Sequence, residues 1–496
     1  MDTQGTRRPA VSLAVSQRKY HPARSGEQEL HAIVSVGVEG ARPGADGPAL
    51  AEVLVIDSSS SMDRPPEKFR AAKNAAVAAL RMLPDGTPFA VVKGTHEAYA
   101  AYPETGPMRP ATPEARAEAE RAVHRMLAAG GTCVGSWLDL ARRLLAGQAA
   151  PIPHVLMLTD GRNEHDDRMP LAGVLDACEG QFTCHAWGIG DGWNARLLLD
   201  VAGRLHGAAD AVHEEDELPG AYRTLVGGLL DKTVPELVIR VSPSPHTTVR
   251  YLKQVYPTEL PLSPRGMPEP GGPADYPTRA WGNELRRFQL CLVTTSAGRP
   301  RDEDLQAAVV EVVLPGTPPG PPGSAAPSGL PGSGGLRLPP PQPYVMRWTD
   351  DPAVSDVTDD LVEHYELYAR LAQAVVQASH AYHDGRGSEA AGRLGVAVTL
   401  AHRLGAARQM AELERLVEVL DPAAGRVVLR PGVQAVDFEY LITVSTHSDY
   451  GPEPGGPGGD LAARGPVELT DCPHCPARIP YDAAFCPRCG HRVEAP

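Results

Sequence analysis

The sequence predicts an α/β protein: a doubly wound parallel sheet inserted in a β-sandwich, followed by a small helical bundle and a cysteine-rich C-terminal module. Three observations support this prediction. Strands and helices alternate between residues 51 and 232, apolar and polar residues alternate on both sides of that region, and apolar residues return to helical spacing after residue 351.

The overall composition fits several globular domains. The chain has 496 residues, which suggests about three domains. Its 50 glycines and 50 prolines gather in a few linker-like stretches, and its formal charge of −14 argues against nucleic-acid binding by most of its surface. There is no N-terminal run of signal-peptide type and no apolar run of about 18 residues, so we expect a cytoplasmic protein without a membrane span.

The central region has the pattern of a parallel sheet covered by helices. The expected strands are residues 52–57, 88–94, 154–160 and 182–190. The expected helices are residues 66–83, 113–129, 134–147, 170–180, 195–205 and 217–232. Ligands bind such sheets at the carboxyl ends of the strands. Asp57 and Asp160 both fall at that edge.

The flanking segments alternate with a period of two, which is typical of half-buried strands. Strands are expected at residues 11–20, 29–38, 235–243, 248–257, 286–295 and 306–315, and we expect them to form one antiparallel sandwich. The resulting domain boundaries are 1–50 for the first sandwich strands, 51–232 for the α/β domain, 233–350 for the rest of the sandwich with a Pro/Gly-rich loop at 315–342, 351–425 for about three helices, 426–468 for a strand segment and linker, and 469–496 for the cysteine module.

The first motif with chemical meaning is Asp57-Ser58-Ser59-Ser60-Ser61, directly after a buried strand. Hydroxyl and carboxylate oxygens are hard ligands that suit Mg²⁺ or Mn²⁺, although this loop alone could also be a solvated turn. Two further loops carry oxygen ligands at the same predicted edge: Gly130-Gly131-Thr132 before a helix, and Thr159-Asp160-Gly161 after a strand.

Together, the three loops resemble the metal-ion-dependent adhesion site of the von Willebrand factor A family, over residues 51–230. The resemblance implies that Ser59 and Ser61 coordinate the cation through their hydroxyls and Thr132 directly or through water. Asp57 and Asp160 would bind mostly through water. The family leaves one coordination position open for a carboxylate of a partner protein.

Two details of the region qualify the resemblance. Many members of the family have glycine where Ser60 stands. Gly188-Ile189-Gly190-Asp191-Gly192 looks like the start of a dinucleotide-binding loop, but the pattern would need glycine at Trp193, and the run comes late in the domain. We therefore do not expect nucleotide binding.

The second motif consists of Cys472, Cys475, Cys486 and Cys489, two C-x₂-C pairs separated by ten residues. Four thiolates at this spacing suit tetrahedral Zn²⁺ in a structural site, and the segment resembles the zinc ribbon at the ends of many bacterial proteins. Two disulfides are the alternative, which a reducing cytoplasm disfavours. The other four cysteines are expected to be free thiols.

These features favour a binding protein over an enzyme. The sequence has no nucleophile elbow, Walker loop, H-E-x-x-H motif or kinase signature. The chain resembles bacterial cytoplasmic A-domain proteins of the tellurium-resistance-associated type, which implies a scaffold or regulator beside kinases and phosphatases. The alternatives are an adaptor for an AAA-type ATPase and, less favoured, a metal-assisted hydrolase built on Asp57 and Asp160, whose loops hold no evident general base.

Overall fold

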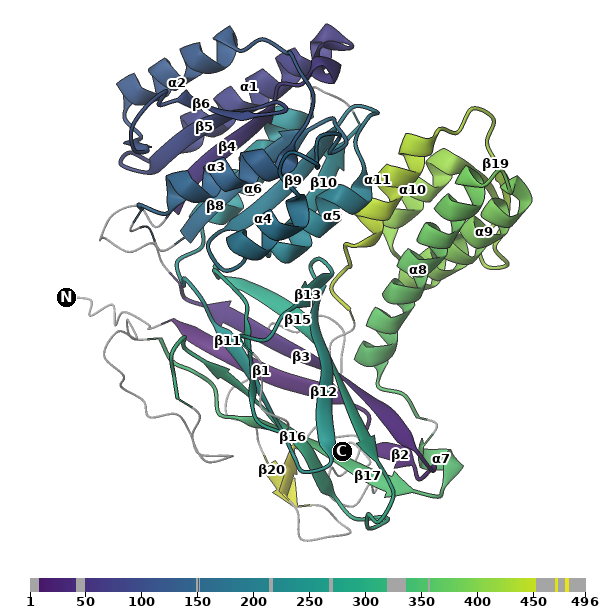
Figure 1. Ribbon diagram of the computed structural model, residues 1–496. Helices are drawn as coiled ribbons and strands as arrows, with labels where there is room; N and C mark the ends of the chain where they lie inside the picture. The colour runs from purple at the N-terminus through teal and green to yellow at the C-terminus, as the bar shows by residue number, and fades with distance from the viewer. Residues whose placement is uncertain are drawn as a thin grey trace, which may run out of the picture.

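An α/β domain, a domain of two sheets and a helical domain make up the protein (Figure 1). The computed structural model describes residues 9–41, 50–148, 150, 152–213, 217–266, 271–318, 336–355, 357–451, 469–471 and 478–480. In this part of the chain, no helix is long and apolar enough to cross a membrane.

The α/β domain, residues 50–230, is built on a sheet with the order β10-β9-β8-β4-β5-β6, and β7 also pairs with β5. The strands are β4 (Leu50–Asp57), β5 (Pro88–Gly94), β6 (Ala98–Tyr102), β7 (Arg109–Pro110), β8 (Ile152–Thr159), β9 (Thr183–Ile189) and β10 (Ala209–Val212). The prediction of a purely parallel sheet is wrong at one edge, because β6 and β7 run antiparallel to β5.

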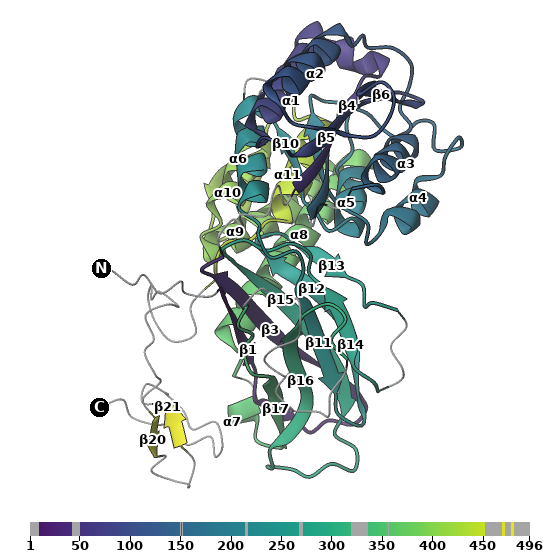
Figure 2. The same ribbon diagram turned by 90° about the vertical axis from the view of Figure 1, so that its left-hand side faces the viewer.

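Helices cover both faces of this sheet. They are α1 (Pro66–Met82), α2 (Pro113–Arg125), α3 (Val134–Leu145), α4 (Leu171–Cys178), α5 (Ala195–Arg204) and α6 (Leu218–Leu230), with a 3₁₀ turn η1 (Ser60–Asp63) before α1. Successive side chains of a strand point to opposite faces. On β4, Leu54 and Ile56 accordingly pack with α1, α2 and α6, whereas Val53 and Val55 pack with α3, α4 and α5 (Figure 2).

The two-sheet domain contains residues from both sides of the α/β domain. One sheet has the order β1-β3-β15-β12-β13, and the other has the order β14-β11-β16-β17-β2. Their bounds are β1 (Ala10–Gln17), β2 (Tyr20–Pro22), β3 (Glu27–Glu39), β11 (Val238–Pro243), β12 (Thr247–Tyr256), β13 (Leu260–Leu262), β14 (Ala274–Pro277), β15 (Glu284–Thr295), β16 (Leu305–Val313) and β17 (Gln342–Thr349). Because β3 pairs with β15 along its length, the α/β domain is an insertion between two paired strands.

Both sheets contribute to one apolar core that includes Trp281, Phe288, Tyr344 and Trp348. The expectation of a wholly antiparallel arrangement is wrong at one point, since β2 pairs with β17 in parallel. The loop predicted at 315–342 is described only at its two ends, and β17 begins at its last residue.

The helical domain, residues 352–451, holds α7 (Pro352–Ser355), α8 (Asp360–His383), α9 (Gly387–Leu404), α10 (Ala407–Leu416) and α11 (Ala435–Ser445), with a hairpin of β18 (Val417–Asp421) and β19 (Arg426–Leu429). The last of the three helices expected within 351–425 ends at Leu416, and the strand β18 follows it directly. The strand segment expected within 426–468 begins with the strand β19 and continues with the helix α11, which was not expected. A capping box between Gln434 and Asp437 stabilises its first turn. The β-branched residues that follow have low helix propensity, which is why the sequence pattern did not indicate a helix.

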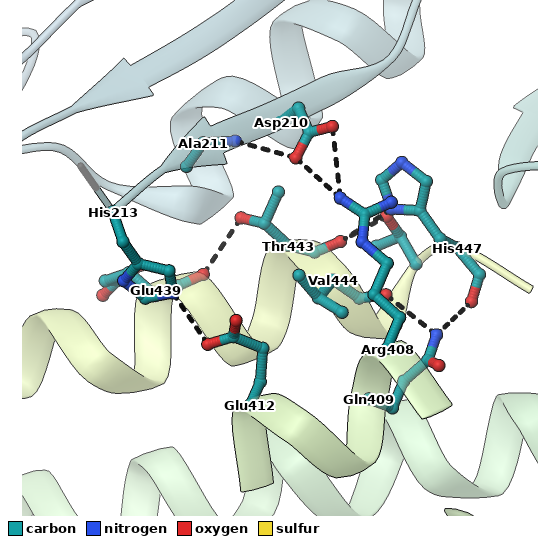
Figure 3. A network of polar contacts seen from close by, with 11 residues as sticks. Asp210, Ala211, His213, Arg408, Gln409, Glu412, Glu439, Thr443, Val444 and His447 are labelled. Carbon is teal, nitrogen blue, oxygen red and sulfur yellow. Dashed lines mark hydrogen bonds and ion pairs between the residues drawn. The ribbon is translucent and has the colours of Figure 1, made fainter. Parts of the chain in front are cut away.

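Helix α11 joins the helical domain to the α/β domain. Phe438 and Leu441 belong to the core between the helices, while Tyr440 belongs to the core on the α3 side of the sheet. Polar contacts reinforce this junction (Figure 3). Arg408 of α10 pairs with Asp210 of β10 at 3.0 Å, and Glu412 accepts a hydrogen bond from His213 at 2.9 Å.

The C-terminal module is described only by a pair of short antiparallel strands, β20 (Leu469–Asp471) and β21 (Arg478–Pro480). The four cysteines predicted to bind zinc, Cys472, Cys475, Cys486 and Cys489, lie outside the described residues. The zinc site stays a prediction. The remaining cysteines are buried free thiols.

Candidate metal centre

The three predicted loops meet at one edge of the α/β sheet. Asp57 is the last residue of β4, and Asp160 directly follows β8, its parallel neighbour. Thr132 lies in the loop that leads into α3. Ser60 of the first loop donates its backbone N–H to the carbonyl of Gly130 at 2.9 Å, which ties the first loop to the second. The edge of the sheet therefore brings together residues that are about a hundred positions apart.

Hydroxyl and carboxylate oxygens form a continuous chain within this edge. The hydroxyls of Ser59 and Ser61 lie 2.9 Å apart, and Ser61 Oγ donates to Asp160 Oδ1 at 2.8 Å. Asp57 Oδ1 accepts the backbone N–H of Ser59 at 2.8 Å, and its Oδ2 accepts the Thr159 hydroxyl at 2.6 Å. These bonds hold the serine loop against the ends of both strands.

The position of Thr132 is shown by its neighbour Gly161. A β-carbon on Gly161 would lie 2.8 Å from Thr132 Oγ1 and 3.3 Å from Asp57 Oδ2. The threonine hydroxyl and the aspartate carboxylate thus reach the same small space, which only glycine leaves open. All five predicted ligand residues are at this one place, and all except the exposed Ser61 are buried.

Ser60 differs from the glycine common in related loops, and its side chain has a local role. Its hydroxyl donates to the carbonyl of Gly130 at 3.0 Å, the same acceptor that its backbone N–H uses. The serine adds a second bond between the first two loops without blocking the site.

Electrostatics at the site are dominated by two buried carboxylates. Burial, together with the nearby charge of Asp160, raises the pKa of Asp57 to about 6 against the opposing hydrogen bonds from Thr159 and Ser59. Two carboxylates in one buried space need compensating positive charge to ionise together. A divalent cation would supply that charge, and the surrounding hydroxyls are ligands of the hard type that Mg²⁺ or Mn²⁺ prefers. The residues present therefore fit such an ion.

Lys68 of α1 is a functional residue that the motif did not indicate. Its ammonium group forms an ion pair with Asp160 Oδ2, and the side chains are 3% and 0% exposed, respectively. Lys68 precedes Phe69 and Ala72 on the buried face of the helix, which is the one signal in the sequence that could have found it. A lysine so near the start of a helix is ordinarily expected to reach solvent.

The glycine-rich run after β9 makes room for this lysine. Gly190 has a φ of +72°, and a β-carbon there would lie 2.6 Å from Lys68 Cδ. Trp193, which breaks the dinucleotide pattern, donates its indole N–H to the carbonyl of Gly190 at 3.0 Å. The glycine thus serves the close approach of a side chain.

An open pocket of about 320 Å³ lies over the serine loop. Its lining includes Ser59, Ser61 and Asp160, together with the exposed charged side chains of Arg64, Glu164 and Asp191. A group presented by another molecule can therefore reach the oxygen ligands from solvent.

Comparisons with known proteins agree with this architecture. A family model described as von Willebrand factor type A domain matches residues 52–211. A solved structure, a von Willebrand factor type A protein from Catenulispora acidiphila, is 30% identical, with a TM-score of 0.76 over 91% of this chain and 99% of that one. The VWA2 paralogue of ArnB from Sulfolobus acidocaldarius is 14% identical, with a TM-score of 0.49 over 89% of this chain and 100% of that one.

Among curated proteins, protein sll0103 of Synechocystis sp. is 29% identical over 216 residues. This alignment covers 42% of the present chain and 49% of that protein, so the chain spans about half of the relative's length. The solved structure from Catenulispora acidiphila, by contrast, is matched over nearly its whole length at 30% identity. The chain belongs to the family of von Willebrand factor type A proteins.

Proposed function

We propose that this protein is a metal-dependent scaffold or regulator that captures an acidic residue of a partner protein at a Mg²⁺-loaded site. The single observation that carries the proposal is the convergence of Asp57, Ser59, Ser61, Thr132 and Asp160 beneath an open pocket. Domains of this type typically mediate protein–protein interactions, and an open pocket over a cation ligand set suits that role.

The roles of the side chains follow from their contacts. Ser59 and Ser61 would hold the ion directly through their hydroxyls, with Thr132, Asp57 and Asp160 completing the set. The bound cation would supply an electrophilic centre for a carboxylate oxygen. The exposed Arg64 can pair with the second oxygen of that carboxylate, and Glu164 would repel partners that carry a second acidic group close by.

Binding is preferred over catalysis on the chemistry of the pocket. A metal-assisted hydrolase needs a group that accepts a proton from the attacking water. Asp160 is paired with Lys68 and Asp57 is buried behind Thr159, so neither is available as a free base. Hydrolysis of a phosphoester with Mn²⁺ that disappears in Asp160→Ala would favour the hydrolase instead.

We further propose that the partner belongs to a phosphorylation-linked signalling or stress system in the cytoplasm, with a protein kinase or phosphatase as the first candidate. An adaptor role for an AAA-type ATPase is the alternative. The two differ in the recovered partner, because an adaptor should co-purify with an ATPase in a manner that depends on the nucleotide as well as on Mg²⁺.

The test is affinity purification of partners with the full chain in Mg²⁺ and in EDTA. The double variant Ser59→Ala/Ser61→Ala should lose the partners that the wild type retains in Mg²⁺. Ser58→Ala is the matched control, since its buried hydroxyl bonds the carbonyl of Ile56 at 3.3 Å and does not face the ligand set. Re-addition of Mg²⁺ alone after EDTA, without Zn²⁺, tests any contribution of the cysteine module. Recovery of the same partners under all conditions would contradict the proposal.

A further inference from the structure

A second cavity, of about 120 Å³, lies at the opposite edge of the α/β sheet from the candidate metal centre. It is lined by the first residues of β8 and β9 on one side and by β12, β13 and β15 of the two-sheet domain on the other. Figure 1 shows this base of the α/β domain facing the two sheets. The cavity is thus formed by two domains and has no connection to the serine loop.

Positive side chains dominate the lining. Lys232, Arg279 and Arg286 face the cavity, and Glu284 is the one carboxylate among its lining residues. Glu284 accepts from Arg286 at 2.6 Å and lies 3.8 Å from the Lys232 ammonium group. Arg286 also donates to the backbone carbonyls of Thr278, at 2.6 Å, and Ala280, so three of its donors are occupied. Arg279 pairs with Glu236 outside the lining at 3.4 Å, whereas Lys232 shares Glu284 with Arg286, so one positive charge is left over among these groups.

Several polar atoms at this cavity lack a close hydrogen-bond partner. His206 Nδ1 and Arg279 Nε are buried and have no hydrogen-bond partner. The nearest carbonyl to Lys232 Nζ, that of Ala280, lies at 3.5 Å, the outer limit of a hydrogen bond. Buried polar groups in native proteins are nearly always paired, so these atoms indicate a missing acceptor. The three residues come from different segments: His206 follows α5, Lys232 follows α6 and Arg279 follows β14.

Backbone strain is found at the same place. His206 has a φ of 55° and Arg279 a φ of 59°, both in the left-handed region that non-glycine residues avoid. Residues held in such conformations tend to cluster at ligand sites, where the surrounding structure fixes them. Here the strain affects the two residues whose buried nitrogen atoms have no partner.

A buried hydrogen-bond relay leads from the sheet to this cavity. Glu52 of β4 lies 2.9 Å from His154 Nδ1, and His154 Nε2 lies 2.7 Å from His185 Nδ1. Burial and the positive charges of Lys232 and Arg286 lower the pKa of His185, and burial lowers the pKa of His154 to about 3. The histidines therefore add neutral polar groups to a cavity whose charge is positive.

We propose that this cavity binds a small tetrahedral oxyanion of the phosphate or sulfate type, which links the α/β domain to the two-sheet domain. The volume of about 120 Å³ admits an ion of this size. Donors from three directions match the several oxygens of a tetrahedral anion better than the two oxygens of a carboxylate. Lys232 supplies the main charge, Arg279 Nε supplies an unpaired donor, and the neutral His206 ring donates through Nδ1 in the tautomer that carries its proton there.

The experiment titrates the full chain with inorganic phosphate and, separately, with sulfate, by calorimetry and by thermal unfolding at constant ionic strength set with chloride. We expect saturable binding of one ion per chain. Lys232→Met should weaken binding at least tenfold. The matched control is Lys73→Met, which removes another partly buried lysine that donates to backbone carbonyls of the same domain, at 3.2 Å for His124. This control should bind as the wild type does.

A second variant tests the proposal even if Lys232→Met does not fold. His206→Gly removes the unpaired nitrogen and suits a left-handed backbone, so it should fold at least as well as the wild type and bind more weakly. Stabilisation by salts that are excluded from protein surfaces does not saturate and would be equal in all variants. That result, or wild-type affinity in His206→Gly, would overturn the proposal. If an organic phosphate ester binds while inorganic phosphate does not, the enclosed-ion assignment is wrong.

Discussion

Substitution of Lys68 by methionine tests whether the candidate metal centre is controlled by an internal cation. Lys68 and Asp160 form an ion pair whose side chains are 3% and 0% exposed. Asp57 is buried beside them, so the ammonium group is the main positive charge that compensates two carboxylates. Methionine keeps most of the aliphatic volume and removes the charge.

The magnitude follows from the burial of the pair. Loss of one partner of a buried ion pair costs about 3–5 kcal/mol, because the other charge is left without compensation. For a domain of this size, 1 kcal/mol corresponds to roughly 2–4 °C in melting temperature, so the metal-free variant should melt about 6–20 °C below the wild type. Mg²⁺ binding should then restore stability, by about 2.7 kcal/mol when the ion is at a hundred times its dissociation constant.

The assay is thermal unfolding of the full chain in EDTA and across a Mg²⁺ titration, for wild type, Lys68→Met and the control Lys73→Met. Removal of the internal cation should give Lys68→Met a larger Mg²⁺-dependent rise in melting temperature than the wild type. Lys73→Met should show the wild-type rise whatever its own stability. Any effect of EDTA on the cysteine module is the same in all three proteins, so it does not contribute to the differences in melting temperature between them. Equal stability in EDTA, or an equal Mg²⁺ response, would refute the role assigned to Lys68.

Three further substitutions test separate parts of the structure. Gly190→Ala should destabilise the protein by about 1–3 kcal/mol in thermal unfolding, and by more than the control Gly106→Ala, which has a similar φ but open space around its β-carbon. Burial lowers the pKa of His21 to about 4, so the unfolded chain takes up a proton below about pH 6.5 and the folded chain only near pH 4. The free energy of unfolding should therefore fall by on the order of 3 kcal/mol as the pH drops from about 6.5 to about 4. Urea denaturation of His21→Gln should show a weaker dependence of this free energy on pH. Cys472→Ser should reduce the zinc content, measured by elemental mass spectrometry, by one ion per chain, and an unchanged content would exclude the predicted ribbon.

The arrangement of the α/β domain could be read from the sequence because its signals are local. Short apolar runs that alternate with amphipathic helices predict a parallel sheet. The carboxyl ends of its parallel strands then lie at one edge. Asp57 and Asp160 could therefore be assigned to one site without coordinates, and the structure places them there. The antiparallel strands β6 and β7 were not predicted, because they are short and have little apolar periodicity.

The features that sequence reasoning missed depend on tertiary contacts. Lys68 shares the helical spacing of the buried residues, but only the position of Asp160 on a different strand makes its burial favourable. Helix α11 is rich in β-branched and aromatic residues, and its helical state depends on packing against two cores at once. Neither effect leaves a pattern within one segment.

These two missed features are connected through Gly190. The hydroxyl of Tyr440 in α11 lies 3.0 Å from the carbonyl of Gly190 and 2.9 Å from that of Val212, and the indole of Trp193 donates to Gly190 as well. Gly190 in turn forms the wall against which Lys68 lies. A helix far along the chain thus holds the glycine that positions the lysine paired with Asp160. The charge balance at the candidate metal centre is consequently a property of the α/β domain and the docked helical domain together, so an isolated α/β domain is not an equivalent substitute for the full chain in measurements of metal affinity.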